Sequence, residues 1–146
     1  METAQGFTAY RETGIKTASP GKLIVLLYNE AIKQLTSASG KIESNGKIKA
    51  SAIETFNRNI IRAQDIITEL MVCLDMEKGG IVSKNLLALY VYFSQELLNA
   101  NITQNKTKLD FIRDMLSELR NAWAAAAANT ASLQSAATRP AVDING

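Results

Sequence analysis

The segment from Thr17 to Tyr28, TASPGKLIVLLY, constrains the fold of this chain more than any other stretch. Ser19 is a preferred N-cap residue, and Pro20 follows at the first helical position, where its missing N–H has no cost. Six hydrophobic residues in succession then run from Leu23 to Tyr28, around most of the helix circumference. An ordinary surface helix has one apolar stripe and one polar face. A helix that is apolar nearly all round is central to a bundle or binds a partner.

The composition of the chain excludes several classes of catalytic and metal site. The 146 residues include no histidine, so the commonest general base and the commonest metal ligand are both missing. Cys73 is the single cysteine, which excludes an internal disulfide and fits neither a thiol–histidine pair nor a zinc site. A reducing compartment is the natural interpretation. We therefore expect no enzyme activity, no metal and no other cofactor.

Charge and hydropathy narrow the possible partners. Sixteen basic residues are scattered among fourteen acidic ones, and the net charge is +2. Because nucleic-acid binding needs a concentrated basic face, we expect no nucleic-acid partner. No apolar run reaches the roughly 18 residues of a membrane span, and the N-terminus lacks the pattern of a signal peptide. The expectation is a cytoplasmic protein without membrane insertion.

Turn signals and hydrophobic periodicity predict four helices. The first begins at Pro20, continues to about Ser39 and is ended by Gly40. A turn over residues 41–49 leads to the second helix, whose charged side chains lie opposite a regular apolar line. That line, the expected core face of the second helix, consists of Ile53, Phe56, Ile60, Ala63, Ile67, Leu70 and Leu74.

The second half of the chain predicts two more helices. Ser83 is the expected N-cap of the third helix, which extends to about Ala100. A polar break over residues 99–105 precedes the fourth helix, from about Lys106 to Ala124. The third helix has two apolar stripes, one with Leu86, Leu89 or Tyr90, Phe93 and Leu97, the other with Leu87, Val91, Ser94 and Leu98. The core line of the fourth consists of Leu109, Ile112, Leu116, Leu119 and Trp123, with Phe111 and Met115 beside it.

Four helices of similar length joined by short loops predict an all-α fold, an antiparallel up-and-down four-helix bundle over residues 19–128. Residues 1–18 have no sustained period, so we expect a flexible N-terminal arm in which Phe7, Tyr10 and Ile15 are apolar anchors. The alanines after Trp123 favour helix but bury little surface. Residues 129–146 are therefore expected to form a disordered tail.

The first and third helices carry more apolar surface than one core face uses. One interpretation is central packing, either within the bundle or against other subunits of a structural or oligomeric assembly. The other is a groove for an amphipathic or extended segment of another protein. Helical geometry then gives six candidate groove residues, namely Val25, Ile32, Ile61, Leu87, Val91 and Leu98.

Several segments, in this order and spacing, resemble the flagellar secretion chaperones of the FliS family. The resemblance extends from Tyr10 to Trp123. Its segments are Tyr10, TASPGKLI at 17–24, LLYNEAI at 26–32, NIIRAQDIITEL at 59–70, LD at 74–75, GG at 79–80, NLLALYVYF at 85–93, LLNAN at 97–101 and LRNAW at 119–123. The chain departs from the pattern at Asn29 and Glu30, where the family has an acidic residue and a glycine after the tyrosine.

The resemblance implies a chaperone function. A protein of this family binds the disordered C-terminal segment of flagellin, prevents premature polymerisation and delivers flagellin to the type III flagellar export gate. It further implies that the N-terminal arm covers part of the binding surface until flagellin arrives. The resemblance also implies that the region around Tyr10, with Ile15, docks at the export gate. Regulatory flagellar proteins are further candidate partners.

Overall fold

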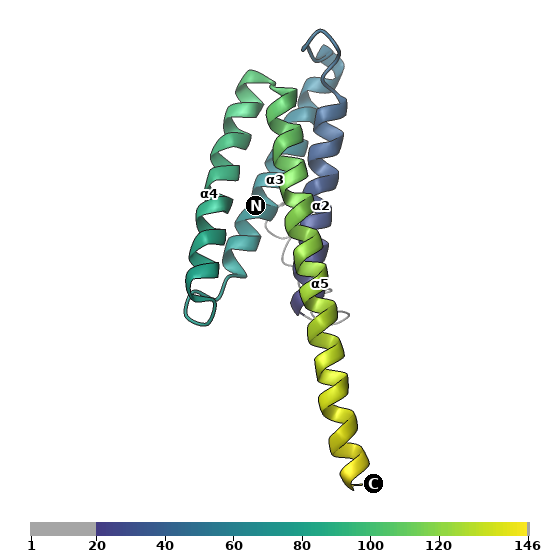
Figure 1. The fold of residues 1–146 in the computed structure, drawn as a ribbon. Coiled ribbons are helices and arrows are strands. Elements are labelled where there is room, and N and C mark those ends of the chain that lie inside the picture. The colour runs from purple at the N-terminus through teal and green to yellow at the C-terminus, as the bar shows by residue number, and fades with distance from the viewer. Residues whose placement is uncertain (1–19, 146) are drawn as a thin grey trace.

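In the computed structural model of this protein, residues 20–145 are described, with side chains over 21–129. The helices are α2 (Pro20–Gly40), α3 (Ile53–Val72), α4 (Gly80–Thr103) and α5 (Lys106–Asn145), and the short 3-10 helix η1 (Ala50–Ala52) precedes α3. Helices α2 and α4 run in one direction and α3 and α5 in the other (Figure 1). The predicted antiparallel four-helix bundle is confirmed.

The predicted N-terminal arm and C-terminal tail lie mainly outside the residues whose side chains are described. The arm, residues 1–18, and its neighbour Ser19 lie outside the described residues. Helix α5 continues to Asn145. In the predicted tail, 129–146, only the side chain of Asn129 is described. The arm and the tail therefore remain predictions. Among the described residues, no helix has the length and apolar character needed to span a membrane.

The helices pack in a cyclic order in which α2 and α4 are diagonal to each other. Helix α2 contacts α3 and α5 along its length, whereas α4 packs mainly on α3 and more sparsely on α5. Figure 1 shows the axes of α4 and α5 diverging away from the connection that joins them. Helix α4 therefore packs more closely on α3 than on α5.

The core follows the predicted apolar lines, although the two ends of the α3 line are less buried, and Leu86, Leu119 and Trp123 on the other lines are only half-buried. Phe56 and the other predicted members within this helix are buried, and they pack against α2, α4 and α5. Ile53 is 38% exposed, because it is the first residue of α3 and lies at the end of the bundle. Leu74 follows the end of α3 and is half-buried. The other fully buried large side chains include Tyr28, Tyr90, Phe93, Leu97, Leu109, Ile112 and Leu116.

The limits of α4 differ from the prediction at both ends. The helix begins at Gly80 rather than after Ser83, so Ser83 is not its N-cap. Ser83 is instead buried inside the first turn, where its Oγ donates a hydrogen bond of 2.9 Å to the carbonyl of Asp75. At the other end α4 continues through the predicted polar break to Thr103. It stops at Gln104, which has a φ of 55°.

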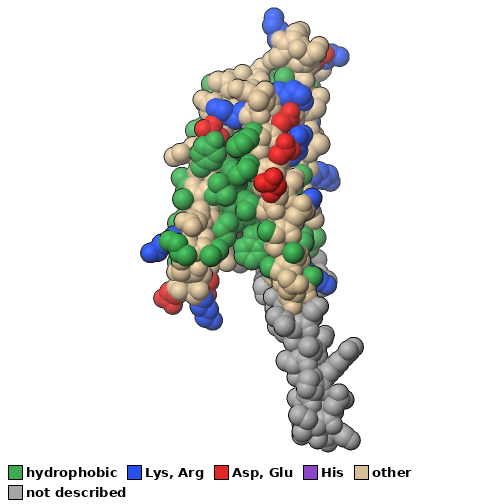
Figure 2. All heavy atoms as spheres, viewed as in Figure 1, with side chains coloured by type: hydrophobic (Ala, Val, Ile, Leu, Met, Phe, Trp, Pro, Cys, Tyr) green, Lys and Arg blue, Asp and Glu red, His purple; other side chains and the backbone are tan. Residues whose placement is uncertain are grey.

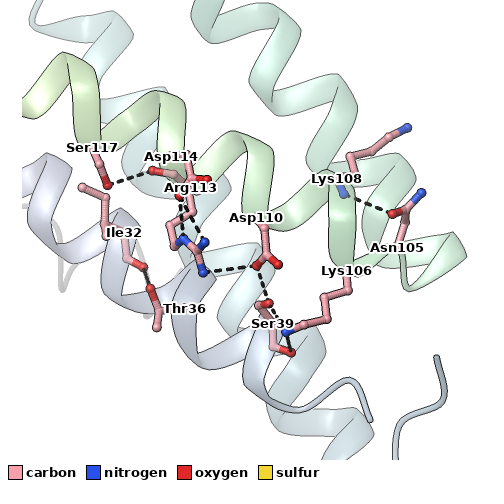
Figure 3. Close-up of polar contacts among 10 residues, drawn as sticks. All are labelled: Ile32, Thr36, Ser39, Asn105, Lys106, Lys108, Asp110, Arg113, Asp114 and Ser117. Atoms are coloured by element: carbon pink, nitrogen blue, oxygen red, sulfur yellow. Dashed lines mark hydrogen bonds and ion pairs between the residues drawn. The ribbon is translucent and has the colours of Figure 1, made fainter. Parts of the chain in front are cut away.

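A polar cluster joins the C-terminus of α2 to the N-terminus of α5 (Figure 3). Ser39 is buried, and its Oγ donates a 2.5 Å hydrogen bond to Oδ1 of Asp110. Lys106 Nζ donates to the Ser39 carbonyl at 3.0 Å and to its Oγ at 2.7 Å. The negative end of the α2 dipole stabilises a cation at this position. Arg113 pairs with Asp110 at 3.2 Å, so the cluster closes this end of the bundle.

Candidate partner-binding surfaces

An apolar pocket of about 240 Å³ lies where α4 and α5 diverge. Helix α2 contributes Ile24, and α5 contributes Trp123, after which α5 continues with five alanines that are too small to fill the space. Figure 2 shows hydrophobic side chains gathered between α4 and α5 on this face of the molecule. The remaining lining residues come from α3, α4 and their connection, namely Leu70, Cys73, Leu74, Asp75, Gly79, Val82, Ser83, Leu86 and Tyr90.

Two tyrosine hydroxyls meet in the centre of the bundle, close to this pocket. The Tyr28 hydroxyl on α2 and the Tyr90 hydroxyl on α4 are 2.5 Å apart, and both side chains are buried. Burial raises the pKa of Tyr90 above its ordinary value, and the neighbouring phenol of Tyr28 raises it further. Burial also raises the pKa of Tyr28, although the bonds to Tyr90 and Trp123 oppose this. Both hydroxyls therefore keep their protons at physiological pH.

The rim of the pocket is held by the connection between α3 and α4. The Asp75 carboxylate accepts hydrogen bonds from the backbone N–H groups of Glu77 and Lys78, at 3.1 and 2.9 Å. The carbonyl of Asp75 accepts from the Gly79 N–H at 2.8 Å and from the Ser83 hydroxyl. A Cβ at Gly79 would lie 1.7 Å from Ser83 Oγ, so only glycine fits this turn. Asp75 therefore fixes the position of one wall of the pocket.

A second apolar surface lies on the outside of the α3–α4 seam. We call it the outer stripe, and it consists of Ile61, Leu87, Val91, Leu98 and Ile102. Gln64 Nε2 on α3 donates to the carbonyl of Ser94 on α4 at 3.3 Å, which sets these two helices side by side at this level. Ile61 is one turn from Gln64, and Val91 and Leu98 flank Ser94 at helical spacing. Leu87 is half-buried, whereas Val91 is 41% and Leu98 56% exposed.

The other two groove candidates lie on the opposite seam of the bundle. Val25 and Ile32 are half-buried on α2, one turn before and one turn after Asn29. Asn29 Oδ1 accepts a hydrogen bond of 3.2 Å from Nη1 of Arg120 on α5. This face of α2 thus borders α5. The structure therefore divides the six groove candidates into two groups: Val25 and Ile32 lie here, and the other four lie together on the outer stripe. Tyr10 and Ile15 lie outside the described residues.

The described residues show no cluster of side chains that suits a metal centre. No group of three or more His, Cys, Asp or Glu side chains in this part of the chain is placed to hold a metal ion. Cys73 is half-buried in the wall of the apolar pocket. The pocket and the outer stripe are apolar, and surfaces of this kind suit a polypeptide partner better than a small polar substrate.

Comparison with known proteins places the chain in a family. A family model described as "Flagellar protein FliS" matches residues 3–130. The flagellar secretion chaperone FliS of Bacillus subtilis is 32% identical over 123 residues, which cover 84% of this chain and 86% of the relative. The chaperone of the same name from Salmonella typhimurium is 30% identical over 132 residues, with 84% and 90% covered. The flagellar secretion chaperone FliSB of Pseudomonas aeruginosa is 32% identical over 112 residues, with 77% and 84% covered.

The chain belongs to the FliS family. The resemblance carried by the ordered sequence segments is thereby confirmed. FliS proteins are flagellar secretion chaperones, and the apolar surfaces described above belong to a protein of that class. The family assignment also favours chaperone function over an enzyme activity.

The two departures from the FliS pattern have structural roles in this chain. Asn29 makes the bond to Arg120 that ties α2 to α5. Glu30 accepts a hydrogen bond of 3.0 Å from Gln34 Nε2 and lies 3.8 Å from Arg62 on α3. Both residues thus stabilise contacts between helices at the solvent-exposed edge of α2. The glycine of the family pattern, placed at this interior position of a helix, would lower helix stability by about 1 kcal/mol.

Sequence reasoning missed the Tyr28–Tyr90 pair and the pocket role of Trp123. Both tyrosines lie on predicted apolar helix faces, and a buried tyrosine needs a hydrogen-bond partner, so a signal was present. The pairing itself depends on α2 and α4 facing each other across the core, which periodicity does not specify. Trp123 was predicted as a core residue, and it is a half-buried side chain of the pocket wall.

Proposed function

We propose that this chain binds the disordered C-terminal segment of flagellin in the cytoplasm, keeps it from polymerising and delivers it to the type III flagellar export gate. The observation that supports this best is the exposed apolar outer stripe, which lies outside the buried core of the bundle. Membership of the FliS chaperone family gives the class of cargo, a flagellar export substrate.

The arrangement of the surfaces favours a long segment that wraps around the bundle. The outer stripe lies on the α3–α4 seam, the pocket lies between α4 and α5, and Val25 and Ile32 lie on the α2–α5 seam. A segment that crosses α4 and α5 contacts all three in turn. Ordering such a segment costs about 2–5 kcal/mol of the interaction energy, so an extended apolar contact is required.

The N-terminal arm is proposed to cover the pocket when flagellin is absent. Pro20 begins α2, and Ile24, one turn later, lines the pocket. Ile15 is five residues before Pro20, and a chain of that length spans at most about 18 Å. Ile15 therefore reaches the pocket end of the bundle more readily than the far end of the outer stripe. Displacement of the arm by flagellin would also release Tyr10 to dock at the export gate.

Titration calorimetry with a synthetic flagellin C-terminal peptide tests the proposed function. We expect one-to-one binding with a negative heat-capacity change of roughly a few tenths of a kcal/mol per kelvin, because coupled folding over an apolar surface buries large areas. Light scattering on the free protein is the control, since the outer stripe would also explain self-association. Binding without a heat-capacity change, or a mass that rises with concentration and no peptide binding, would contradict the proposal.

Deletion of residues 1–16 tests the role of the arm. The helices should remain folded, because Pro20 still begins α2 and Ser19, the predicted N-cap, is retained. Trp123 is the single tryptophan and lines the pocket, so its emission should shift to longer wavelength when the cover is removed. Peptide affinity should be maintained or increase, since no arm must be displaced first. A truncated protein that is monomeric but binds the peptide much more weakly would show that the arm is part of the binding site.

A further inference from the structure

We infer that the outer face of the α4–α5 seam binds an apolar stretch of the flagellin segment that carries a lysine or arginine, and that Glu118 selects this basic side chain. The inference rests on the proposed function, because the occupant is the flagellin C-terminal segment. It goes beyond that function in naming a further contact surface and the charge of the residue that this surface selects.

The register of α4 and α5 places four large apolar residues beside one another. Lys108 on α5 lies 2.6 Å from the carboxylate of Glu96 on α4, which fixes the level at which these antiparallel helices meet. One and two turns away from this ion pair, the same faces of both helices are apolar. We call these four residues the seam patch: Leu89 and Tyr92 on α4, and Phe111 and Met115 on α5.

The seam patch is only partly covered in the described part of the chain. Tyr92 is 42% and Phe111 is 50% exposed, whereas Leu89 and Met115 are half-buried against the core. Figure 2 shows hydrophobic side chains along the strip between α4 and α5. Leu86, one turn before Leu89, lines the pocket, so the patch continues into the pocket opening. A segment that enters the pocket therefore covers the seam patch as it leaves.

The charged residues beside the seam patch differ between its two helices. Residues 85–95 of α4 carry no charge. On α5, Arg113 pairs with Asp110 at 3.2 Å and with Asp114 at 3.1 Å, so these charges are compensated locally. Glu118 is exposed one turn beyond the patch, and it has no ion pair among the described residues. Figure 2 shows acidic side chains along this side of α5.

The uncompensated carboxylate of Glu118 determines which charge the occupant brings to the seam patch. Arg120, the next cation along α5, bonds to Asn29 on α2 and so lies towards the other flank of the helix. In a complex, the apolar patch and its occupant exclude water beside the carboxylate. This exclusion strengthens both the attraction for a cation and the repulsion of an anion. An apolar stretch with a lysine or arginine here therefore binds better than one with an acidic residue.

The test measures the affinity of the full-length protein for a synthetic flagellin C-terminal peptide by calorimetry at low and high salt. Glu118→Lys should weaken binding about fivefold at low salt, because repulsion replaces attraction. At about 1 M salt the loss relative to wild type should shrink to less than about twofold, since the screening length is then about 3 Å. Glu43→Lys makes the same charge change in the exposed turn between α2 and α3, so it is the matched control and should bind nearly as wild type does.

Phe111→Ala tests the apolar part of the seam patch. The bundle should remain folded in this variant, because half of the Phe111 side chain is exposed. Peptide affinity should fall about tenfold at either salt concentration, because the apolar area that the peptide covers is lost. Circular dichroism checks the fold of each variant before titration.

The outcomes separate this inference from the proposed function. A wild-type protein that does not bind the peptide would disprove both. Wild-type binding with unchanged affinity in Phe111→Ala would overturn the inference alone, and so would equal affinities of Glu118→Lys and Glu43→Lys. Tighter binding by Glu118→Lys would assign the seam patch to the N-terminal arm as a competitor. A concentration-dependent mass that Phe111→Ala abolishes would assign it to a second copy of the chain, and either result would overturn the inference.

Discussion

Replacement of Phe56 by alanine is expected to lower the free energy of unfolding by about 3–5 kcal/mol. Phe56 has no exposed surface and lies in the central cluster with residues of all four helices. Its removal leaves a cavity in a close-packed interior that relaxes only in part, so the loss exceeds the transfer energy of the ring alone. Urea denaturation monitored by circular dichroism measures the change.

The matched control for this substitution is Phe111→Ala. Phe111 is 50% exposed on α5, so the same truncation there should cost less than about 1 kcal/mol. If the two variants were equally stable, Phe56 would not be a core residue and the packing of α3 in the bundle would be wrong. If Phe111→Ala lowered the stability and Phe56→Ala did not, Phe56 would likewise not be a core residue.

Val91→Asp is expected to reduce affinity for the flagellin peptide about a hundredfold while the bundle still unfolds cooperatively. Val91 belongs to the outer stripe and is 41% exposed, so the charge is hydrated in the free protein. In the complex the carboxylate would be buried against an apolar partner, at a cost of about 3 kcal/mol, which corresponds to roughly a hundredfold in affinity. Calorimetric titration gives the affinity, and thermal melting gives the stability.

Asn85→Asp provides the control for Val91→Asp. It adds the same charge to an exposed position of α4, about a third of a turn away from Val91 around the helix. Peptide binding should be nearly unchanged in this variant. Should Val91→Asp unfold the protein as severely as Phe56→Ala, Val91 would be a core residue. Should both aspartate variants bind equally well, the outer stripe would not be the binding surface.

The sequence was most informative about features that depend on one helix alone, such as where the helix ends and which of its faces is buried. Helix α2 begins at Pro20 and ends at Gly40, as its local residues predict, since proline at the first turn and glycine at the last act within a few residues. The buried positions of α3 follow the predicted line from Phe56 to Leu70 for the same reason. Prediction failed where distant groups compete, as at Ser83, whose hydroxyl bonds to Asp75 instead of capping α4.

The candidate site illustrates the same limit. Periodicity identified Ile61, Val91 and Leu98 as apolar positions outside the main core lines, and all three are exposed. It also grouped Val25 and Ile32 with them, although these residues lie on another seam. Periodicity gives the angle of a residue around its own helix. It does not give the rotation of one helix against the next.

The amino-acid sequence by itself determined the class of fold, the order of the four helices, the family and the apolar character of the exposed surfaces. These follow from local propensity and from segments whose order is recognisable. Only the tertiary structure decided that α4 and α5 diverge into a pocket, that Tyr28 meets Tyr90 across the core, and that Trp123 lines the opening. Such features arise from contacts between residues on different helices, 62 positions apart for Tyr28 and Tyr90, and they depend on how four helices share one interior.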